Sequence, residues 1–503
     1  MKRREFIKTG GAALIGAAVL PQISCIQMNN ISTNLAGMMN HFSVSSNDLR
    51  KVITVALEKG GDYADLFFEH TMSNNIALQD GDVNSANSNI QYGVGIRVVA
   101  GDQTGYAYVE NITLEDMMNA ARTASRIATG SAKTPPVKID EKTFKNYYPV
   151  LNSWEETSIQ LKMPFLQKLN ARIFELDPRV IKVNASIIDT TSYILYYNSE
   201  GTLCHDYRPM VVVRGQCIMQ QGNMIENNGS SRAGRRDFNF LTDELIDEMA
   251  REAVDYTSIL FEAVKPRGGE MPVVMAAGGS GILLHEAIGH AFEADFNRKN
   301  VSIFSDKLNQ KICDEHINVV DEGTIEGSRG AINFDDEGIE SQKTYIVKDG
   351  ILNSYLHDRI SAKHYGIAPT GNGRRQTFKH IPIPRMRITY MENGDYSEEE
   401  IIASVKQGVY LDKFLNGQVQ IGAGDFTFFV KNGYLIENGK LTRPIKDVNI
   451  IGNGPKALAD ITMVSNNLKI DTGAWTCGKD GQSAPVSQGL PSVLVKQLTV
   501  GGE

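Results

Sequence analysis

The sequence is poor in cysteine and tryptophan and contains no long apolar run. Its 503 residues include five cysteines and two tryptophans. None of the cysteines forms a C-x-x-C pair, which excludes a disulfide scaffold. A Cys204–Cys217 bridge is compatible with an oxidising compartment, but two buried free thiols are the favoured interpretation.

Clusters of basic residues are also missing from the body of the chain. The formal net charge is −8, with 51 lysines and arginines against 59 acidic residues. Nucleic-acid-binding proteins carry a basic patch, so this composition excludes DNA and RNA as main partners.

The first 25 residues have the pattern of an export signal. Adjacent Arg3 and Arg4 are followed by Phe6 and a glycine- and alanine-rich apolar stretch that ends near Pro21. This order is typical of a twin-arginine signal, and the apolar stretch is shorter than the roughly 20 residues that span a bilayer. We therefore expect twin-arginine export to the periplasm, with Cys25 as a candidate lipid anchor. Residues 26–44 lack periodicity and are expected to form a tether.

The remaining sequence alternates helical and strand patterns, which predicts an α+β fold. Periodicity and capping residues predict helices near 46–60, 113–130, 157–175 and 243–258. We expect an N-terminal α+β domain over 45–262, with a subdomain boundary near 131–142, and a β-rich C-terminal domain over 263–503 that carries the metal-binding helix. In that second domain, the pairs Asp349-Gly350, Asn432-Gly433 and Asn438-Gly439 predict hairpin turns.

A histidine pair in the segment GGSGILLHEAIGHAFEADF (278–296) is a candidate metal site. In H-E-x-x-H proteases two histidines four apart share one helix face, with the glutamate as general base. His285 and His290 are five apart, so on a straight α-helix they would point about 140° away from each other. A left-handed cap at Gly289 or a one-turn π-bulge would bring them together. Either geometry makes Gly289 a structural requirement and leaves Glu286 beside the first histidine.

Cys477 is the candidate third ligand, because a zinc site that keeps one position for water uses three protein ligands and His₂Cys is an accepted set. Glu293 and Asp295 are alternative carboxylate ligands. A solvated acidic stretch, or a position that orients the histidines, is favoured for them. The remaining candidates, His316, His357, His364 and His380, lack chelating spacing.

Four long motifs resemble the TldD branch of the TldD/PmbA family: LLHEAIGHAFEADFNRK, PTGNGRRQTFKHIPIPRM, YLIENGKLTRPIKDVNIIGNG and CGKDGQSAPV. The resemblance implies a zinc metalloprotease that acts on unfolded peptides. By position, His285, His290 and Cys477 match the ligands of one zinc ion per chain, and Glu286 matches the catalytic base. It also implies a homodimer, or a heterodimer with a PmbA-like (TldE) subunit that lacks the metal motif, with the site enclosed at the interface.

The predicted function is a zinc-dependent peptidase for unfolded or small peptides, with Glu286 activating a metal-bound water. Typical members of this branch are cytoplasmic, so the export signal favours periplasmic peptide turnover instead. A non-catalytic peptide-binding or assembly subunit is the alternative. A redox protein is suggested only by the export route, and no cofactor fingerprint supports it.

The stretch 371–375 adds candidate substrate-binding residues: Asn372, Arg374 and Arg375. Arginine forks bind carboxylates and peptide carbonyls. A structural turn with solvated or paired arginines is the alternative for this stretch.

Overall fold

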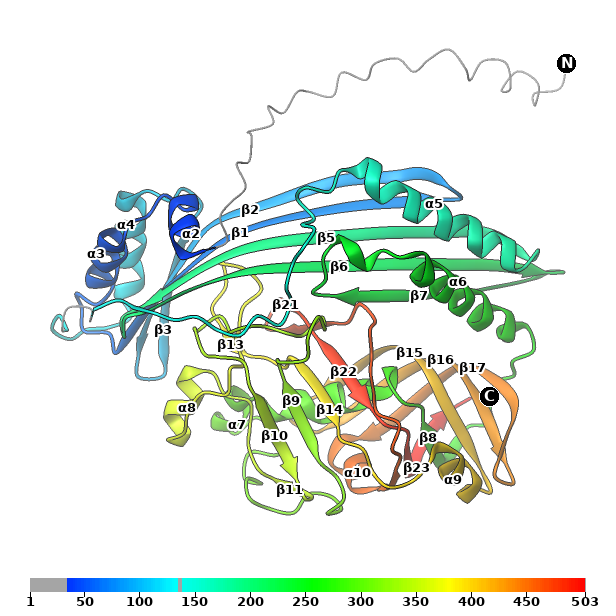
Figure 1. Ribbon diagram of the computed structural model, residues 1–503. Coiled ribbons are helices and arrows are strands. Elements are labelled where there is room, and N and C mark those ends of the chain that lie inside the picture. The colour runs from blue at the N-terminus through cyan, green and yellow to red at the C-terminus, as the bar shows by residue number, and fades with distance from the viewer. Residues whose placement is uncertain (1–33, 134–137, 503) are drawn as a thin grey trace, which may run out of the picture.

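The computed structural model describes residues 34–133 and 138–502 of the chain (Figure 1). The expected export signal, Cys25 and residues 26–33 of the expected tether lie outside the described residues. Within those two ranges, no helix combines the length and the apolar character needed to cross a membrane.

A long, curved antiparallel sheet forms the N-terminal region (Figure 1). Its strands run in the order β3-β2-β1-β5-β6, and β6 also pairs with β7 and the short β4. The bounds are β1 (Tyr63–Gln79), β2 (Asp82–Ala100), β3 (Gln103–Val109), β4 (Asp140–Glu141), β5 (Val180–Asn198), β6 (Thr202–Gln221) and β7 (Met224–Gly234). Strand β1 pairs with β5 from Asp65 to Gln79, so the sheet is continuous across the expected subdomain boundary near 131–142.

Two groups of helices cover different parts of this sheet. One group packs on β1, β2 and β5 through a shared apolar core: α2 (Leu35–His41), α3 (Ser46–Ala56) and α4 (Leu114–Ser125). The other packs on β5, β6 and β7: α5 (Ile159–Leu176) and α6 (Asp243–Ser258), with the short η1 (Phe238–Phe240) and η2 (Ile259–Phe261) at its ends. Helices α3, α4, α5 and α6 confirm the four helices that the sequence periodicity predicted. Helix α3 is capped by Ser45, one residue earlier than expected, through a capping box with Asp48.

Helix α2 corrects the expectation that residues 26–44 are only a tether. Residues 35–41 are helical, and Met38 and the following Phe42 are fully buried in the core. The Asn34 side chain accepts a hydrogen bond from the amide of Gly37 and caps the helix. His41 at its end lies 2.8 Å from His70 of β1, measured between Nε2 and Nδ1. Apolar burial therefore attaches this segment to the sheet, although its short sequence shows no clear period.

The C-terminal region lies below the sheet in Figure 1 and is rich in strands. One sheet runs β17-β16-β15-β8-β23-β18, and an additional pairing of β17 with β23 closes part of it into a ring. Its bounds are β8 (Gly269–Met275), β15 (Gln407–Gln420), β16 (Asp425–Glu437), β17 (Lys440–Asn453), β18 (Ile461–Val464) and β23 (Val493–Gly501).

A second sheet of this region runs β11-β10-β9-β14-β22-β19. Its strands are β9 (Val319–Glu322), β10 (Lys343–Lys348), β11 (Ile351–Leu352), β14 (Ile388–Met391), β19 (Lys469–Ile470) and β22 (Ser487–Leu490). Two small hairpins pair β12 (Gly373–Arg374) with β13 (Ile383–Pro384), and β20 (Thr476–Lys479) with β21 (Gln482–Pro485). The helices are α7 (Ala294–Arg298), α8 (Arg359–Tyr365), α9 (Glu398–Ser404) and α10 (Gly454–Ala459).

Two of the three expected hairpin turns are present. Asp349-Gly350 and Asn438-Gly439 adopt positive φ between paired strands. The expectation for Asn432-Gly433 is wrong, because both residues lie inside β16 and pair with β15 and β17. The Asn432 side chain donates to the carbonyl of Tyr256 and is buried, so it joins the strand to α6. Cys204 and Cys217 are buried free thiols, as favoured.

Buried ion pairs join the two regions. Arg97 of β2 bonds to Asp65 of β1 and, at 2.6 Å, to Glu337 of the C-terminal region. Arg208 of β6 bonds Asp336 at 2.7 Å. Breaking a buried pair leaves an uncompensated charge, so these contacts hold the sheet against the C-terminal region.

Candidate metal centre

His285 lies in a π-helix, and His290 directly follows its last residue. Strand β8 leads through Gly278 (φ 100°) into the turn η3 (Gly279–Gly281), the π-helix η4 (Leu283–Gly289) and the turn η5 (His290–Phe292). The amide of His290 donates to the carbonyl of His285, five residues earlier. This register places side chains five apart on the same face, so the bulge expectation is confirmed. The alternative of a left-handed cap is wrong, since Gly289 has φ −59°.

Gly289 is needed because of close packing rather than an unusual φ. A Cβ atom there would lie 2.2 Å from Sδ of Met386 and 2.9 Å from the carbonyl oxygen of Leu284. Neither approach is sterically allowed. The helix is therefore pressed against Met386, which follows β13, and only glycine fits at the contact.

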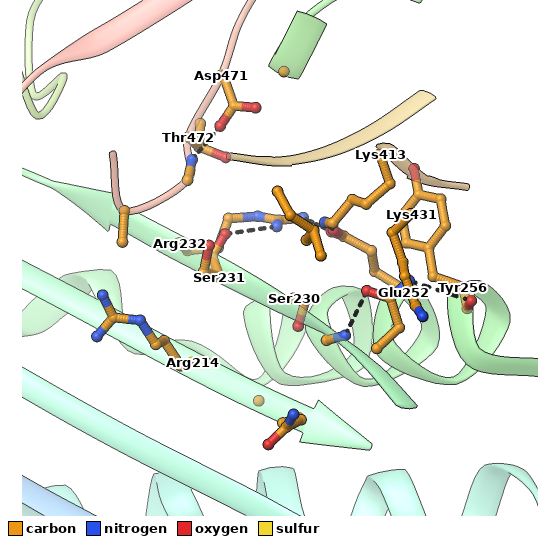
Figure 2. A pocket seen from close by; sticks show the side chains of 18 of the residues that line it. Arg214, Ser230, Ser231, Arg232, Glu252, Tyr256, Lys413, Lys431, Asp471 and Thr472 are labelled. Carbon is orange, nitrogen blue, oxygen red and sulfur yellow. Dashed lines mark hydrogen bonds and ion pairs between the residues drawn. The ribbon is translucent and has the colours of Figure 1, made fainter. Parts of the chain in front are cut away.

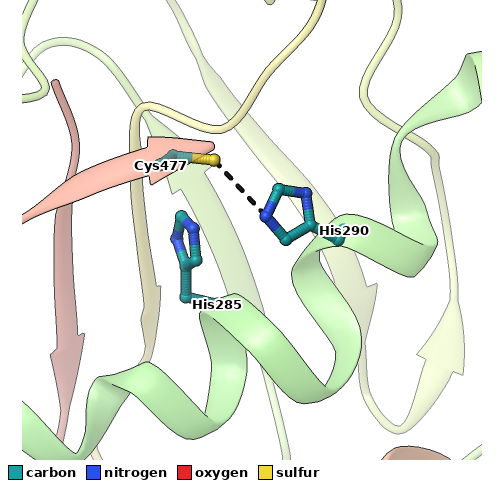
Figure 3. A group of neighbouring side chains, drawn as sticks. All are labelled: His285, His290 and Cys477. Atoms are coloured by element: carbon teal, nitrogen blue, oxygen red, sulfur yellow. Dashed lines mark hydrogen bonds between the residues drawn. The ribbon is translucent and has the colours of Figure 1, made fainter. Parts of the chain in front are cut away.

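Three potential ligands converge at this helix (Figure 3). One ligand atom from each of His285, His290 and Cys477 lies within 4.8 Å of the others, and all three residues are buried. The Sγ of Cys477 on β20 is 3.4 Å from Nε2 of His290. The Nδ1 of His285 is buried without a hydrogen-bond partner in the described part of the chain. The structure thus joins a helix and a hairpin that are almost two hundred residues apart.

A second layer of charged groups orients His290. Its Nδ1 lies 2.9 Å from Oε2 of the fully buried Glu293, which leaves Nε2 directed toward Cys477. Lys479 contacts Glu293 at 3.2 Å and Asp295 at 2.7 Å. Both carboxylates are thus engaged with Lys479 instead of joining the ligand atoms. Carboxylate–histidine pairs of this kind fix the tautomer and ring orientation of metal ligands.

The charges of these groups depend on one another. Burial raises the pKa of Cys477, but the neighbouring His285 and His290 outweigh burial and hold that pKa well below its usual value. Burial opposes protonation of His290, yet Glu293 and Cys477 raise its pKa well above the ordinary range. Burial raises the pKa of Glu293, but Lys479 and His290 outweigh burial and lower that pKa to about 2. A bound cation requires a thiolate at Cys477 and neutral histidines, so a proton leaves His290 when the cation binds.

Glu286 lies beside the three ligands but is less enclosed. Its side chain is half-buried, and its Cγ would be 3.2 Å from a Cβ placed on Gly417 of β15. Burial raises its pKa, while His285 and His290 act in the opposite direction. A carboxyl group with a raised pKa exchanges protons more readily near neutral pH, which suits a general base that returns its proton.

The stretch 371–375 bonds mainly to the protein itself. Asn372 is fully buried and donates to Oδ1 of Asp321 and to the carbonyl of Arg385. Arg374 donates to the carbonyls of Met386 and Pro485, at 2.6 and 2.7 Å. Arg375 donates to the carbonyl of Asp336 and lies 3.7 Å from Asp65. This bonding matches the structural alternative, since the stretch fixes the hairpin β20–β21 and the sheet.

Sequence reasoning missed Lys479 and Arg385. Lys479 neutralises two carboxylates near the histidines, and the fully buried Arg385 donates to the carbonyl of Cys477 at 2.6 Å. Both occur in the motifs CGKDGQSAPV and PTGNGRRQTFKHIPIPRM. A basic residue in a glycine- or proline-rich motif was the available signal, but its partners are distant in sequence.

A cleft of about 960 Å³ lies between the sheet and the C-terminal region (Figure 2). It is lined by β5–β7 and α6 on one side, and by β15, β16 and residues 469–475 on the other. Its lining includes Gly279, Leu415 and Trp475. These residues are close in sequence to the π-helix, Gly417 and Cys477, but His285, Glu286, His290 and Cys477 are not themselves part of the lining.

Comparison with known proteins identifies the family. Three sequence models match the chain: PmbA/TldA metallopeptidase domain 1 over residues 64–128, the central domain over 152–261 and the C-terminal domain over 268–502. The chain belongs to the PmbA/TldD metallopeptidase family. Its similarity to proteins named TldD homologues places it on the TldD branch.

Relatives match the chain over nearly its full length. A metalloprotease TldD homologue of Haemophilus influenzae is 36% identical over 94% of this chain and 99% of its own. A zinc metalloprotease TldD homologue of Saccharolobus solfataricus is 28% identical over 90% of this chain and 99% of its own. The crystal structure of TldE from Thermococcus kodakarensis shares the fold, with a TM-score of 0.70 at 18% identity, over 90% of this chain and all of that one.

Proposed function

We propose that this protein is a zinc-dependent peptidase for unfolded or small peptides. The convergence of His285, His290 and Cys477 next to Glu286 carries the proposal. The family and the names of its relatives, metalloproteases and a zinc metalloprotease, support the class of reaction.

The three side chains fit a zinc ion. Bond lengths of zinc to nitrogen and sulfur give ligand atoms about 3.6 Å apart in a tetrahedron. The 3.4 Å between Cys477 and His290 agrees with this spacing, and the unpaired nitrogen of His285 is a further donor. When bound, zinc acts as a Lewis acid that polarises a carbonyl and lowers the pKa of water. Three protein ligands leave the fourth position of a tetrahedral zinc ion for water or for the carbonyl of a substrate.

The protein's own residues perform the proton transfers in this proposal. Glu286 accepts a proton from the attacking water and passes it to the leaving amine. Glu293 keeps His290 in one tautomer, and Lys479 keeps Glu293 ionised despite burial. The cleft of Figure 2 has the volume of typical ligand sites and supports an extended peptide as the substrate.

Location and assembly complete the proposal. The export pattern of residues 1–25 supports a periplasmic enzyme, possessing a lipid anchor if Cys25 is acylated. The shared fold with TldE supports a dimer with a second copy or with a TldE-like subunit.

The test uses purified full-length protein loaded with zinc. We expect about one zinc per chain and cleavage of an unstructured peptide. Glu286→Gln removes the base without removing a ligand, so it should lower kcat by about 100-fold or more while the zinc content stays the same. The matched control is Glu322→Gln, a half-buried glutamate on β9. Full activity in Glu286→Gln refutes the assigned base, and a metal-free native protein that binds peptide without cleaving it indicates a binding subunit instead.

A further inference from the structure

A second cavity, of about 500 Å³, lies between the sheet and the hairpin β20–β21. Five of the described residues that line it are arginines: Arg208, Arg235, Arg329, Arg374 and Arg375. The lining contains two carboxylates, Glu69 and Asp336. Hydroxyl groups from β1, β5 and the hairpin make up much of the remaining surface. The cavity is therefore polar and has an excess of positive charge.

Three of these arginines have no carboxylate partner among the described residues. Arg235 donates to the carbonyls of Ala331 and Pro209. Arg329 donates to the carbonyl of Trp475 and the hydroxyl of Thr476, and Arg374 bonds only carbonyls. Arg235 and Arg374 are 6% and 4% exposed, so their charges are buried without a carboxylate in direct contact. Burying a cation in this way is costly unless an anion offsets it.

The carboxylates in the lining are already engaged. Asp336 pairs with Arg208 and accepts the amide of Arg375. Both oxygens of Glu69 accept hydrogen bonds, one from Thr71 and one from the amide of Phe378. Asp336 also acts on Arg374 and Arg375, so these two carboxylates offset only part of the positive charge of the five arginines.

Two of the arginines that line the cavity have an unused donor. Nη1 of Arg329 and Nε of Arg375 are buried and have no hydrogen-bond partner within residues 34–133 and 138–502. Burial lowers the pKa of Arg329 to about 10, and that of Arg374 to about 9. Neighbouring arginines contribute to both pKa shifts in the same direction as burial, and Asp336 opposes the shift of Arg374.

We propose that this cavity binds an oxyanion, a carboxylate or phosphate group, beside Arg329 and Arg375. Guanidinium groups and hydroxyls are the donors that recognise such groups. The oxyanion supplies negative charge and accepts hydrogen bonds from the guanidinium and hydroxyl groups that line the cavity.

The site is distinct from the metal centre but shares the hairpin with it. Thr476 lines the cavity, and the next residue, Cys477, points to the histidines, because successive strand residues face opposite sides. Arg329 connects the cavity to this strand through Trp475 and Thr476. An oxyanion bound at Arg329 therefore stabilises the hairpin that presents the thiolate.

The oxyanion has two chemical sources. The first source is the terminal carboxylate of a peptide, and this source rests on the proposed function. The second is a free small anion, which is independent of the proposed function. Binding measurements without turnover separate them, and they remain informative if the protein hydrolyses nothing.

The first experiment measures inorganic phosphate binding by calorimetry. We expect wild-type protein to bind phosphate, and Arg329→Gln to bind it at least tenfold more weakly. Arg329→Lys keeps the charge without the fork and should be intermediate. Arg251→Gln on α6 is the matched control, because it makes the same charge change at an exposed arginine. Circular dichroism and the melting midpoint establish that each variant is folded.

The second experiment uses an unstructured hexapeptide with a free or an amidated C-terminus, bound to the Glu286→Gln protein. A peptide source predicts about tenfold weaker binding after amidation, and no effect of amidation once Arg329→Gln is added. A free-anion source predicts that amidation has no effect while phosphate binding still depends on Arg329. The proposal is overturned if neither phosphate nor amidation distinguishes Arg329→Gln from Arg251→Gln.

Discussion

Replacing Gly289 by alanine tests the packing of the π-helix. The backbone there is right-handed helical, with φ −59° and ψ −50°, so helix propensity alone favours alanine by about 1 kcal/mol. The added methyl would instead lie 2.2 Å from Sδ of Met386 and 2.9 Å from the Leu284 carbonyl. Overpacking costs about 1–3 kcal/mol, and the carbonyl belongs to the π-helix itself. After subtraction of the propensity gain, we expect a net loss of up to about 2 kcal/mol.

The clash should also displace His290 from the ligand group. We expect zinc affinity, measured by competition with a chelating dye, to fall about 10- to 100-fold, as it does when groups that orient metal ligands are removed. The control is Gly478→Ala, next to Cys477, where a Cβ would meet no atom within 4 Å. In a Met386→Ala background the cost of Gly289→Ala should shrink. If Gly289→Ala stabilises the protein and leaves zinc affinity unchanged, the packing argument is wrong.

Three further predictions concern charge and ligation. Cys477→Ser removes the thiolate ligand and should retain less than about a tenth of the zinc after dialysis, as measured by elemental analysis. The control Cys313→Ser, which changes a buried thiol outside the ligand group, should retain the zinc. Lys479→Met leaves the buried Asp295 unpaired and Glu293 with His290 alone, and should cost about 3 kcal/mol at pH 7 in urea denaturation. This loss relative to wild type should shrink toward pH 5, because burial raises the pKa of Asp295 and a protonated Asp295 needs no cation beside it. An equal loss at pH 7 and pH 5 contradicts this prediction. Burial lowers the pKa of His70 to about 4 from an ordinary 6.5, so the unfolded chain binds a proton at a higher pH than the folded protein does. The free energy of unfolding should therefore fall as the pH drops from about 6.5 to 4, and it should fall less steeply in His70→Gln.

Local patterns in the sequence predicted much of the N-terminal region. The capping residue Thr242 and the apolar period of 243–258 specify α6 at the expected bounds, because these signals act within a few residues. Asn432-Gly433 shows the limit of such signals. Its turn propensity is overridden by two flanking strands and a hydrogen bond to α6, which are contacts from distant parts of the chain.

The part of the candidate site that depends on the spacing of residues along the chain was predictable from the sequence. The five-residue interval between His285 and His290 required a departure from the α-helix, and the structure has one. The same interval left the cap and the bulge open, since both are allowed for glycine. The structure has the bulge, with Gly289 packed against Met386, and no sequence pattern indicated that contact.

By itself, the sequence determined which residue types are present and how helix and strand patterns follow one another, because those properties depend on neighbours along the chain. Only the tertiary structure decided which distant groups meet. It placed Lys479 between Glu293 and Asp295 and directed the arginines of 371–375 into the protein. It also brought Arg235, Arg329 and Arg374 to one cavity without a carboxylate in direct contact among the described residues. The physical reason is that burial and charge pairing depend on distances in space, which the order of residues does not fix.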